Sequence, residues 1–293
     1  MDLYLLSIFL GIVEGLTEFL PVSSTAHLRV FEAVLGVDLK DGYWKMYTVV
    51  IQLGAILCLP LHFRGRIEGY FKTFPKGRFG DKTMVTHPLS LTLIAFACTA
   101  APAFLLSKLI GKQLESLFVM GFSLIIGGLV MWLVDVLYGT RRMGKRVRGA
   151  KDGTGPDEME QMTLPQAVWI GCCQTLSAVF PGTSRSMATI AAGQVAGLSR
   201  AGALEFSFLV SIPTMFAATG YEFLKALRGG SGFHMGAQEG VMLFIGFAVS
   251  FLVAHLVVKW FLAWVKRHGF VPFALYRIVA GAGVLLWAFS GRL

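Results

Sequence analysis

Two short segments of this chain combine side chains that could handle a phosphate group. The first is Glu14-Gly-Leu-Thr-Glu-Phe-Leu-Pro-Val-Ser-Ser-Thr-Ala-His27, and the second is Pro181-Gly-Thr-Ser-Arg-Ser-Met-Ala-Thr189. Carboxylates and a histidine can take up or deliver a proton, and a serine can attack phosphorus. An arginine binds phosphate oxygens through its planar fork of N–H donors. Both segments are therefore candidates for a catalytic site.

The acidic residues of the first segment are Glu14 and Glu18. Their spacing of four places both carboxylates on one face of a helix, one turn apart. The surrounding stretch is apolar, so we expect the pair to face a cavity, a cation or a basic partner. An ordinary solvated pair at a membrane surface is the alternative. Two such carboxylates could hold a divalent cation, or one could act as a base while the other orients it.

Three hydroxyl residues, Ser23, Ser24 and Thr25, follow the proline of the first segment. Hydroxyls beside the free backbone amides of a helix start form a natural phosphate cradle. Simple N-capping, which needs only one hydroxyl, is the alternative. His27 lies three residues beyond Ser24, on the same side of a helix, and could transfer a proton; a purely structural histidine is the alternative.

The second segment adds Arg185 between Ser184 and Ser186. A permanently charged guanidinium suits bidentate phosphate binding, whereas a snorkelling arginine at the membrane surface is the alternative. Arg277, which also lies in an apolar stretch, is interpreted as a snorkelling or helix-contact residue and is left out of the site.

The two segments belong to a repeat. Residues 11–24 and 171–184 lie 160 positions apart and share glycine, leucine, proline and serine at matching positions. The chain is therefore interpreted as a single membrane domain of two related halves, residues 1–138 and 164–293, joined by a linker at 139–163.

The composition indicates an integral membrane protein. Hydrophobic residues make up 55% of the chain, charged residues only 15%, and the mean hydropathy is +0.66. Charge-poor stretches of about 20 residues can cross a hydrocarbon core as helices. Six such spans are expected, at 44–63, 88–107, 117–137, 203–222, 240–260 and 271–290. Because no segment shows the alternating polarity of barrel strands, the fold is predicted to be all-helical.

Each half also contains a segment that is broken by a proline, at 3–35 and 164–198. A helix normally ends before a proline, and broken helices at membrane depth line cavities. We therefore expect two helical hairpins that enter the membrane and return, with tips that meet. A hairpin followed by three spans inverts the second half relative to the first.

Loop charge agrees with this topology. The loops 62–87, 139–163 and 263–269 hold fourteen lysines and arginines, against seven on the other side. The richer side is predicted to be cytoplasmic, with both termini outside. Since topology explains the net charge of +9, and the basic residues lack interleaved aromatics, a nucleic-acid partner is not expected.

The two segments resemble the signatures of a known family. Residues 14–27 are similar to the first signature of the bacterial undecaprenyl pyrophosphate phosphatases, the bacitracin-resistance family, and residues 181–189 match the second, Pro-Gly-x-Ser-Arg-Ser-x-x-Thr. Glu205-Phe-Ser-Phe and Pro272-Phe-x-x-Tyr-Arg277 are also similar, so the resemblance covers nearly the whole chain. Two departures are Ala26 and Met187, which stand where the family usually has glycine. The methionine is expected either to narrow the phosphate pocket or to face lipid.

The resemblance implies hydrolysis of undecaprenyl pyrophosphate to the monophosphate and inorganic phosphate. This reaction recycles the lipid carrier for peptidoglycan and other cell-wall polymers and confers bacitracin resistance. It further implies a site in the bacterial cytoplasmic membrane that opens to the periplasmic side, a divalent cation such as Mg²⁺ or Ca²⁺, and a homodimer. An inverted repeat with broken helices is also transporter architecture, so movement of a prenyl phosphate or a small anion is the alternative function.

The matched residues suggest roles. Ser24 would attack the terminal phosphorus, Glu18 or His27 would activate it or protonate the leaving group, and Arg185 would stabilise the developing charge. Glu14 would bind the cation with Glu18, or tune Glu18. A direct attack by water, with Ser24 only binding, is the alternative. Further contacts with the substrate are expected from Ser23, Thr25, Ser184, Ser186 and Thr189.

Overall fold

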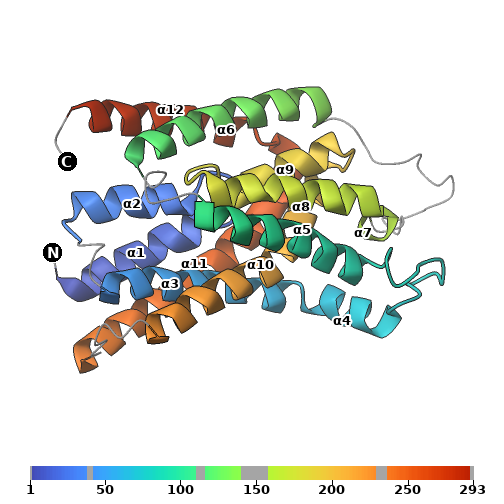
Figure 1. Ribbon diagram of the computed structural model, residues 1–293, viewed down its shortest axis with the longest axis horizontal. Helices are drawn as coiled ribbons and strands as arrows, with labels where there is room; N and C mark the ends of the chain where they lie inside the picture. Colours follow the sequence, from blue (N-terminus) through green and yellow to red (C-terminus); the bar gives the residue numbers. More distant parts are fainter. Residues whose placement is uncertain (1, 38–41, 110–115, 140–157, 229–235, 291–293) are drawn as a thin grey trace.

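The computed structural model describes residues 2–37, 42–109, 116–139, 158–228 and 236–290, and within these ranges every regular element is a helix. The helices form an elongated bundle (Figure 1). They are α1 (Leu3–Thr17), α2 (Ser24–Val34), α3 (Gly42–His62), α4 (Arg64–Thr73), α5 (Pro88–Leu109), α6 (Leu117–Tyr138), α7 (Glu158–Gln161), α8 (Leu164–Val179), α9 (Arg185–Val195), α10 (Arg200–Arg228), α11 (Ala237–His268) and α12 (Val271–Phe289).

Five of these helices, α5, α6, α10, α11 and α12, are long and apolar enough to cross a membrane. A sixth candidate span is the pair α3 and α4, which bends by 62° at residue 63. These six elements lie where the apolar stretches of the sequence predict spans. The prediction of an all-helical fold is therefore confirmed, and length and composition support five spans, or six if the bent pair forms one span.

Two segments expected to be loops contain helices. The segment 62–87 begins with α4, and the segment 139–163 ends with α7, although residues 140–157 lie outside the described part of the chain. The charges of α4 suggest a loop, but Ile67 and Tyr70, three residues apart on one helical face, pack against the main apolar core. Their burial stabilises a helix that its mean hydropathy does not reveal.

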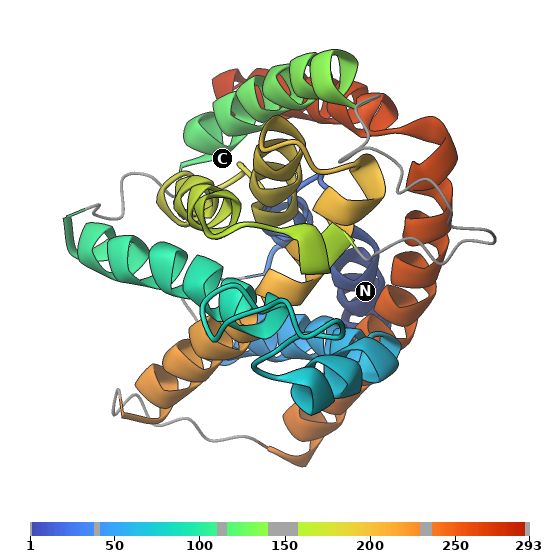
Figure 2. The same ribbon diagram turned by 90° about the vertical axis from the view of Figure 1, so that its right-hand side faces the viewer.

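The remaining short helices form two hairpins, α1–α2 and α8–α9. In Figure 1 the first lies in the left half of the bundle and the second to its right, so that their turns face each other near the middle. Seen along the long axis in Figure 2, the longer helices lie around these short ones. Each turn contains a proline, Pro21 or Pro181, which disfavours the helical conformation of the residue before it.

Helices α6 and α12 pack closely at a pair of glycines. A Cβ atom at Gly281 would lie 2.8 Å from the carbonyl oxygen of Gly121, and a Cβ at Gly121 would lie 3.2 Å from the oxygen of Gly281. The two glycines are 160 residues apart, as are the two copies of the sequence repeat. Close approach of the two backbones therefore depends on glycine at both positions.

The end of α6 is fixed by a buried carboxylate, Asp135, which is 1% exposed. It accepts hydrogen bonds from Gln194 Nε2 at 2.9 Å, from Arg200 Nε at 2.7 Å and from the backbone N–H of Phe270 at 2.9 Å. These donors come from α9, from the start of α10 and from the connection between α11 and α12. One side chain thus ties together segments that are far apart in the sequence.

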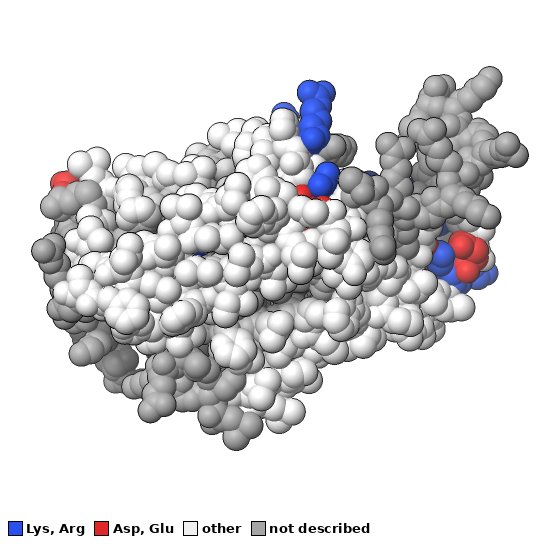
Figure 3. Space-filling view, turned by 90° about the horizontal axis from the view of Figure 1, so that it is seen from above, with Lys and Arg blue, Asp and Glu red and all other residues white. Residues whose placement is uncertain are grey.

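Charged side chains occupy little of the surface seen in Figure 3. Most of the visible Lys, Arg, Asp and Glu residues gather toward the right-hand part of the view, the side on which Figure 1 places α4. Apart from an acidic side chain at the left edge, a broad part of the described surface on this face shows almost no charge. Such a surface suits contact with lipid rather than water.

Candidate active site

The first turn, residues 18–23, joins α1 to α2 and ends in an unusual backbone conformation. Ser23 has a φ of 75°, in the left-handed region that few non-glycine residues adopt. Its hydroxyl accepts a hydrogen bond from the amide of Ala26 at 3.4 Å and so caps α2. This capping leaves the neighbouring hydroxyl, that of Ser24, available for another partner.

The second turn, between α8 and α9, repeats this arrangement. Ser184 has a φ of 69°, and its hydroxyl caps α9 by accepting from the amide of Met187 at 3.3 Å. Gly182 has a φ of 94°, and a Cβ there would lie 2.7 Å from the carbonyl oxygen of Met120 in α6. The turn therefore requires glycine both for its conformation and for its contact with α6.

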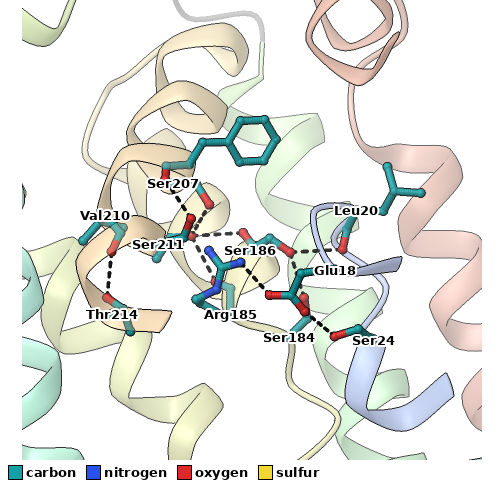
Figure 4. Close-up of polar contacts among 12 residues, drawn as sticks. Glu18, Leu20, Ser24, Ser184, Arg185, Ser186, Ser207, Val210, Ser211 and Thr214 are labelled. Atoms are coloured by element: carbon teal, nitrogen blue, oxygen red, sulfur yellow. Dashed lines mark hydrogen bonds and ion pairs between the residues drawn. The ribbon is translucent and has the colours of Figure 1, made fainter. Parts of the chain in front are cut away.

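The two turns meet through Glu18, as the repeat predicts. Ser24 Oγ donates a hydrogen bond to Glu18 Oε2 at 2.5 Å, and Arg185 Nη2 donates to Glu18 Oε1 at 3.0 Å (Figure 4). Ser186 Oγ also donates to the carbonyl oxygen of Leu20 at 3.0 Å. The carboxylate of the first turn thus connects a hydroxyl at the start of α2 to a guanidinium at the start of α9. Side chains in such contact can serve as a nucleophile, a base and an anion-binding group.

Burial distinguishes these residues from surface charges. The side chains of Glu18 and Arg185 are 4% and 9% exposed, and Ser24 is 6% exposed. The alternatives of a solvated acidic pair and a snorkelling arginine are therefore wrong. Hydrogen bonds between charged groups are stronger in such an environment than in water, because few water molecules compete for them.

Arg185 retains unused binding capacity. Its Nη2 contacts Glu18, whereas its buried Nε and Nη1 have no hydrogen-bond partner among the described residues. A buried guanidinium nitrogen without a partner is costly unless an anion occupies the site. The two unused nitrogens fit the oxygens of a phosphate group.

Glu14 lies one turn before Glu18 on α1 and is fully buried. Both of its carboxylate oxygens lack a hydrogen-bond partner among the described residues. A proton or a cation must compensate such a carboxylate. The described residues contain no group of three histidine, cysteine, aspartate or glutamate side chains that could hold a metal ion. The donor set therefore fits only a cation that takes most of its ligands from substrate and water, as Mg²⁺ usually does.

The remaining hydroxyls of the two segments differ in their surroundings. Thr25 is exposed, and Ser184 Oγ lies 3.0 Å from Ser186 Oγ. Thr189 Oγ1 lies 3.0 Å from the carbonyl oxygen of Arg185 and 2.6 Å from Ser207 Oγ of α10. The structure thus brings Ser184 and Ser186 close to Arg185, while Thr189 joins α9 to α10.

Both ring nitrogens of His27 have hydrogen-bond partners other than Glu18, Ser24 and Arg185. Nδ1 lies 2.7 Å from the carbonyl oxygen of Ser23, and Nε2 lies 2.6 Å from the hydroxyl of Tyr276 in α12. Among the described contacts, His27 has no hydrogen bond to Ser24 or Glu18. Tyr276 belongs to a stretch that resembles the family, but the sequence gives no signal for its contact with His27.

Arg277 is the residue that sequence reasoning leaves out and the structure brings to the turns. It is fully buried, so the snorkelling alternative is wrong. Its Nη1 donates to the carbonyl oxygen of Pro21 at 3.1 Å, and its Nη2 donates to those of Gly182 at 3.0 Å and Ser123 at 3.1 Å. One guanidinium therefore joins both turns and α6. An arginine within an apolar span, directly after the tyrosine of a recognisable motif, is the signal that could have identified it.

The two departures from the family pattern are both buried. Ala26 is 2% exposed and packs with Leu124 and Val284. Met187 is 4% exposed, so the lipid-facing alternative is wrong. Its side chain packs against Gly127 and lines a cavity of about 560 Å³ between α6, α8 and α9.

Comparison with known proteins identifies the family. A family model described as "Bacitracin resistance protein BacA" matches residues 7–283. An undecaprenyl-diphosphatase of Koribacter versatilis is 59% identical to the chain and covers 98% of it, with 99% of the relative's own length aligned. Undecaprenyl-diphosphatases of Novosphingobium aromaticivorans and Persephonella marina are 41% and 39% identical, over 98% and 96% of the chain and 98% and 97% of their own lengths. The chain therefore belongs to the bacitracin resistance protein BacA family, whose members are multi-pass integral membrane proteins.

Proposed function

We propose that this chain hydrolyses undecaprenyl pyrophosphate through the group formed by Glu18, Ser24 and Arg185. Membership of the family makes the chain an undecaprenyl-diphosphatase. The observation that carries the catalytic assignment is the position of Glu18, whose two oxygens contact a buried hydroxyl at 2.5 Å and a buried guanidinium at 3.0 Å. A base, a nucleophile and an anion-binding group are thus in direct contact.

In the first step, Ser24 Oγ forms a bond to the terminal phosphorus while the bond from that phosphorus to the bridging oxygen breaks. Undecaprenyl phosphate leaves with the bridging oxygen, and Glu18 takes the proton of the hydroxyl. In the second step, water attacks the phosphorus of the phosphoserine and the bond from phosphorus to Ser24 Oγ breaks. Glu18 returns its proton to Ser24 Oγ and takes one from the attacking water, and inorganic phosphate leaves. Arg185 stabilises the charge on the transferred phosphoryl oxygens in both steps.

Direct attack by water is the competing mechanism, with Ser24 serving only to bind. The two mechanisms differ in whether a covalent intermediate forms. Substrate labelled with ³²P in its terminal phosphate, mixed with the enzyme and quenched in acid, should leave label on Ser24. A Ser24→Ala variant should retain none. Full turnover by wild type without any protein-bound label at the shortest quench times would favour the water mechanism.

We also propose which residue acts as the base and which residues hold the cation. Of the two candidate bases, Glu18 is favoured over His27, because only Glu18 contacts the hydroxyl of Ser24. Glu14 and Glu18 would hold a divalent cation, such as Mg²⁺ or Ca²⁺, together with pyrophosphate oxygens and water. The bound cation would neutralise charge on the pyrophosphate.

For the topology, we propose that both hairpins enter the membrane and return, the first from the periplasmic face and the second from the cytoplasmic face. The facing turns and the reciprocal contact of Gly121 and Gly281 support halves 1–138 and 164–293 that are inverted with respect to each other. The site would then open to the periplasmic side, with both termini outside. Labelling of single cysteines by a membrane-impermeant maleimide tests this: a cysteine replacing Asp2 should react in intact cells, and one replacing Lys76 should not.

The decisive test of function is the release of inorganic phosphate from undecaprenyl pyrophosphate by the purified protein in detergent. Transport needs two compartments, and detergent micelles provide none, so phosphate release there distinguishes hydrolysis from the alternative of lipid or anion transport. Parallel reactions with a chelator and with shorter prenyl pyrophosphates would establish the cation requirement and the chain-length selectivity. Light scattering of the same sample would test the homodimer that the family resemblance suggests.

A further inference from the structure

Tyr276 of α12 makes an unexpected contact with α2, the second helix of the first hairpin. Its hydroxyl lies 2.6 Å from His27 Nε2, and the two rings are nearly parallel, with centroids 5.6 Å apart and planes 8° apart. The contact joins residues separated by 249 positions in the chain. It places a phenol beside the histidine that the sequence proposes for proton transfer.

The direction of the hydrogen bonds follows from the chemistry of the groups. A carbonyl oxygen only accepts, so His27 Nδ1 must carry the proton that it donates to Ser23 O at 2.7 Å. In a neutral imidazole the other nitrogen is then an acceptor, so the hydroxyl of Tyr276 donates to Nε2. The hydrogen bonds therefore run from Tyr276 through His27 to the carbonyl of Ser23.

That carbonyl belongs to the residue that sets the geometry of the nucleophile. Ser23 adopts a φ of 75° and directly precedes Ser24. Its carbonyl oxygen accepts from both the ring and the backbone N–H of His27, at 2.7 and 3.3 Å. A conformation of this kind persists only when its surroundings hold it in place. Fixing this peptide fixes where the Ser24 hydroxyl meets Glu18.

The second turn lacks this connection. Counted from the left-handed serine, the position of His27 is taken by Ala188, whose backbone N–H donates to the carbonyl of Ser184 at 3.0 Å. The side chain of alanine has no donor, so no ring supports this carbonyl among the described contacts. Both turns share the left-handed serine, but only the turn with the proposed nucleophile has the additional support. Of the two turns, the one that precedes the proposed nucleophile therefore has the hydrogen bond from a ring to the serine carbonyl, although both turns share the same backbone conformation.

From these contacts we infer that Tyr276 is a positioning residue for Ser24, and that it acts through His27 and the Ser23 carbonyl. This inference rests on the proposed role of Ser24. In this inference His27 fixes the Ser23 peptide by hydrogen bonding, whereas the sequence suggests that His27 transfers a proton. A misplacement of a reacting group by about 1 Å can lower a rate by about 10²-fold. Loss of the hydrogen bond from Tyr276 to His27, which does not touch the reacting groups, should lower the rate less, by about tenfold.

A double-mutant cycle tests the connection. Tyr276→Phe keeps the ring and removes the donor, and it should lower kcat for phosphate release about tenfold with little change in KM. In a His27→Ala background the same change should have no further effect, because the intermediate group is gone. Tyr43→Phe is the matched control, since it also removes one hydroxyl, which donates to Glu239 O at 3.0 Å. Multiplied losses in the double variant, or a wild-type kcat in Tyr276→Phe, would overturn the inference.

Conservative substitutions of His27 separate positioning from proton transfer. The amide nitrogen of asparagine can replace Nδ1 as a donor to the Ser23 carbonyl, but an amide cannot transfer protons as imidazole does. His27→Asn should therefore retain at least tenfold more activity than His27→Ala. Equal inactivity of both, with wild-type melting temperatures, would assign His27 to proton transfer and reject the inference. Failure of the wild type itself to release phosphate would instead reject the proposed function.

Discussion

Glu18 and Ser24 lie six residues apart in the sequence, yet the hydroxyl of the serine donates to the carboxylate at 2.5 Å across the first turn. The other oxygen of Glu18 accepts from Arg185 at 3.0 Å. The ion pair orients the carboxylate, and the carboxylate in turn orients the hydroxyl. The proposed nucleophile is thus positioned by a residue from the other half of the chain.

Replacing Glu18 should therefore affect chemistry more than binding. Glu18→Gln keeps the shape but cannot accept the serine proton, so kcat should fall on the order of 10²–10⁴-fold. The rate of phosphate release at saturating substrate gives kcat, and a titration of substrate gives KM. Together they show whether the substitution affects chemistry more than binding. Glu68→Gln is the control, because Glu68 lies on α4 in an exposed ion pair with Arg64. Retention of more than about a tenth of wild-type kcat would assign the base elsewhere.

Arg185→Lys preserves the charge but removes the fork of donors. Nε and Nη1, which have no partner among the described residues, would lose their proposed contacts with phosphate. A lysine provides a point charge without bidentate geometry, so kcat/KM should fall about 10²–10³-fold. Inorganic phosphate, as a competitive inhibitor, should also bind more weakly. Unchanged inhibition by phosphate in this variant would show that Arg185 does not contact the product.

Much of the architecture is predictable because it depends on local composition. Spans follow from about 20 apolar residues in succession, and the turns follow from Pro21 and Pro181 with hydroxyls after them. The repeat further predicts that the turns meet, and the contact between Glu18 and Arg185 confirms it. The sequence does not predict α4, because its apolar contact with the core comes from the buried Tyr70 and the partly buried Ile67 on one face rather than from overall hydropathy.

The contacts made by α12 are beyond sequence reasoning for a different reason. Tyr276 and Arg277 reach His27, Pro21 and Gly182 only because α12 packs on α6 in one register. That register depends on close backbone packing, which sequence periodicity does not specify. The same limit applies to Thr189. Its residue type suits phosphate binding, but the packing of α9 on α10 places its hydroxyl 2.6 Å from Ser207 Oγ.

Glu14→Gln tests the proposed cation. The amide removes a negative charge from a buried position whose oxygens have no partner among the described residues. If a divalent cation binds there with substrate, the variant should need at least tenfold more Mg²⁺ or Ca²⁺ for half-maximal activity. Titration of each cation into chelated enzyme measures this. Full activity of both wild type and Glu14→Gln in excess chelator would show that a proton, rather than a cation, neutralises Glu14.

Arg277→Met removes the guanidinium that joins the two turns. The carbonyls of Pro21, Gly182 and Ser123 would each lose a donor, at roughly 1–3 kcal/mol for a buried group without a partner. Both the melting temperature in detergent and kcat should therefore fall. Arg64→Met on the exposed surface of α4 controls for loss of an arginine. A variant that melts like wild type would show that the turns hold their positions without this residue.

Asp135→Asn should separate stability from catalysis. The carboxylate accepts from Gln194, Arg200 and the backbone of Phe270, and an amide cannot accept at both of its terminal atoms. Removing one partner of a buried ion pair costs roughly 3–5 kcal/mol, so the melting temperature should fall clearly. Below that temperature kcat should stay at the wild-type value, since Asp135 contacts none of Glu18, Ser24 and Arg185 within the described residues. A loss of kcat without a loss of stability would show that this end of the bundle controls the geometry of the two turns.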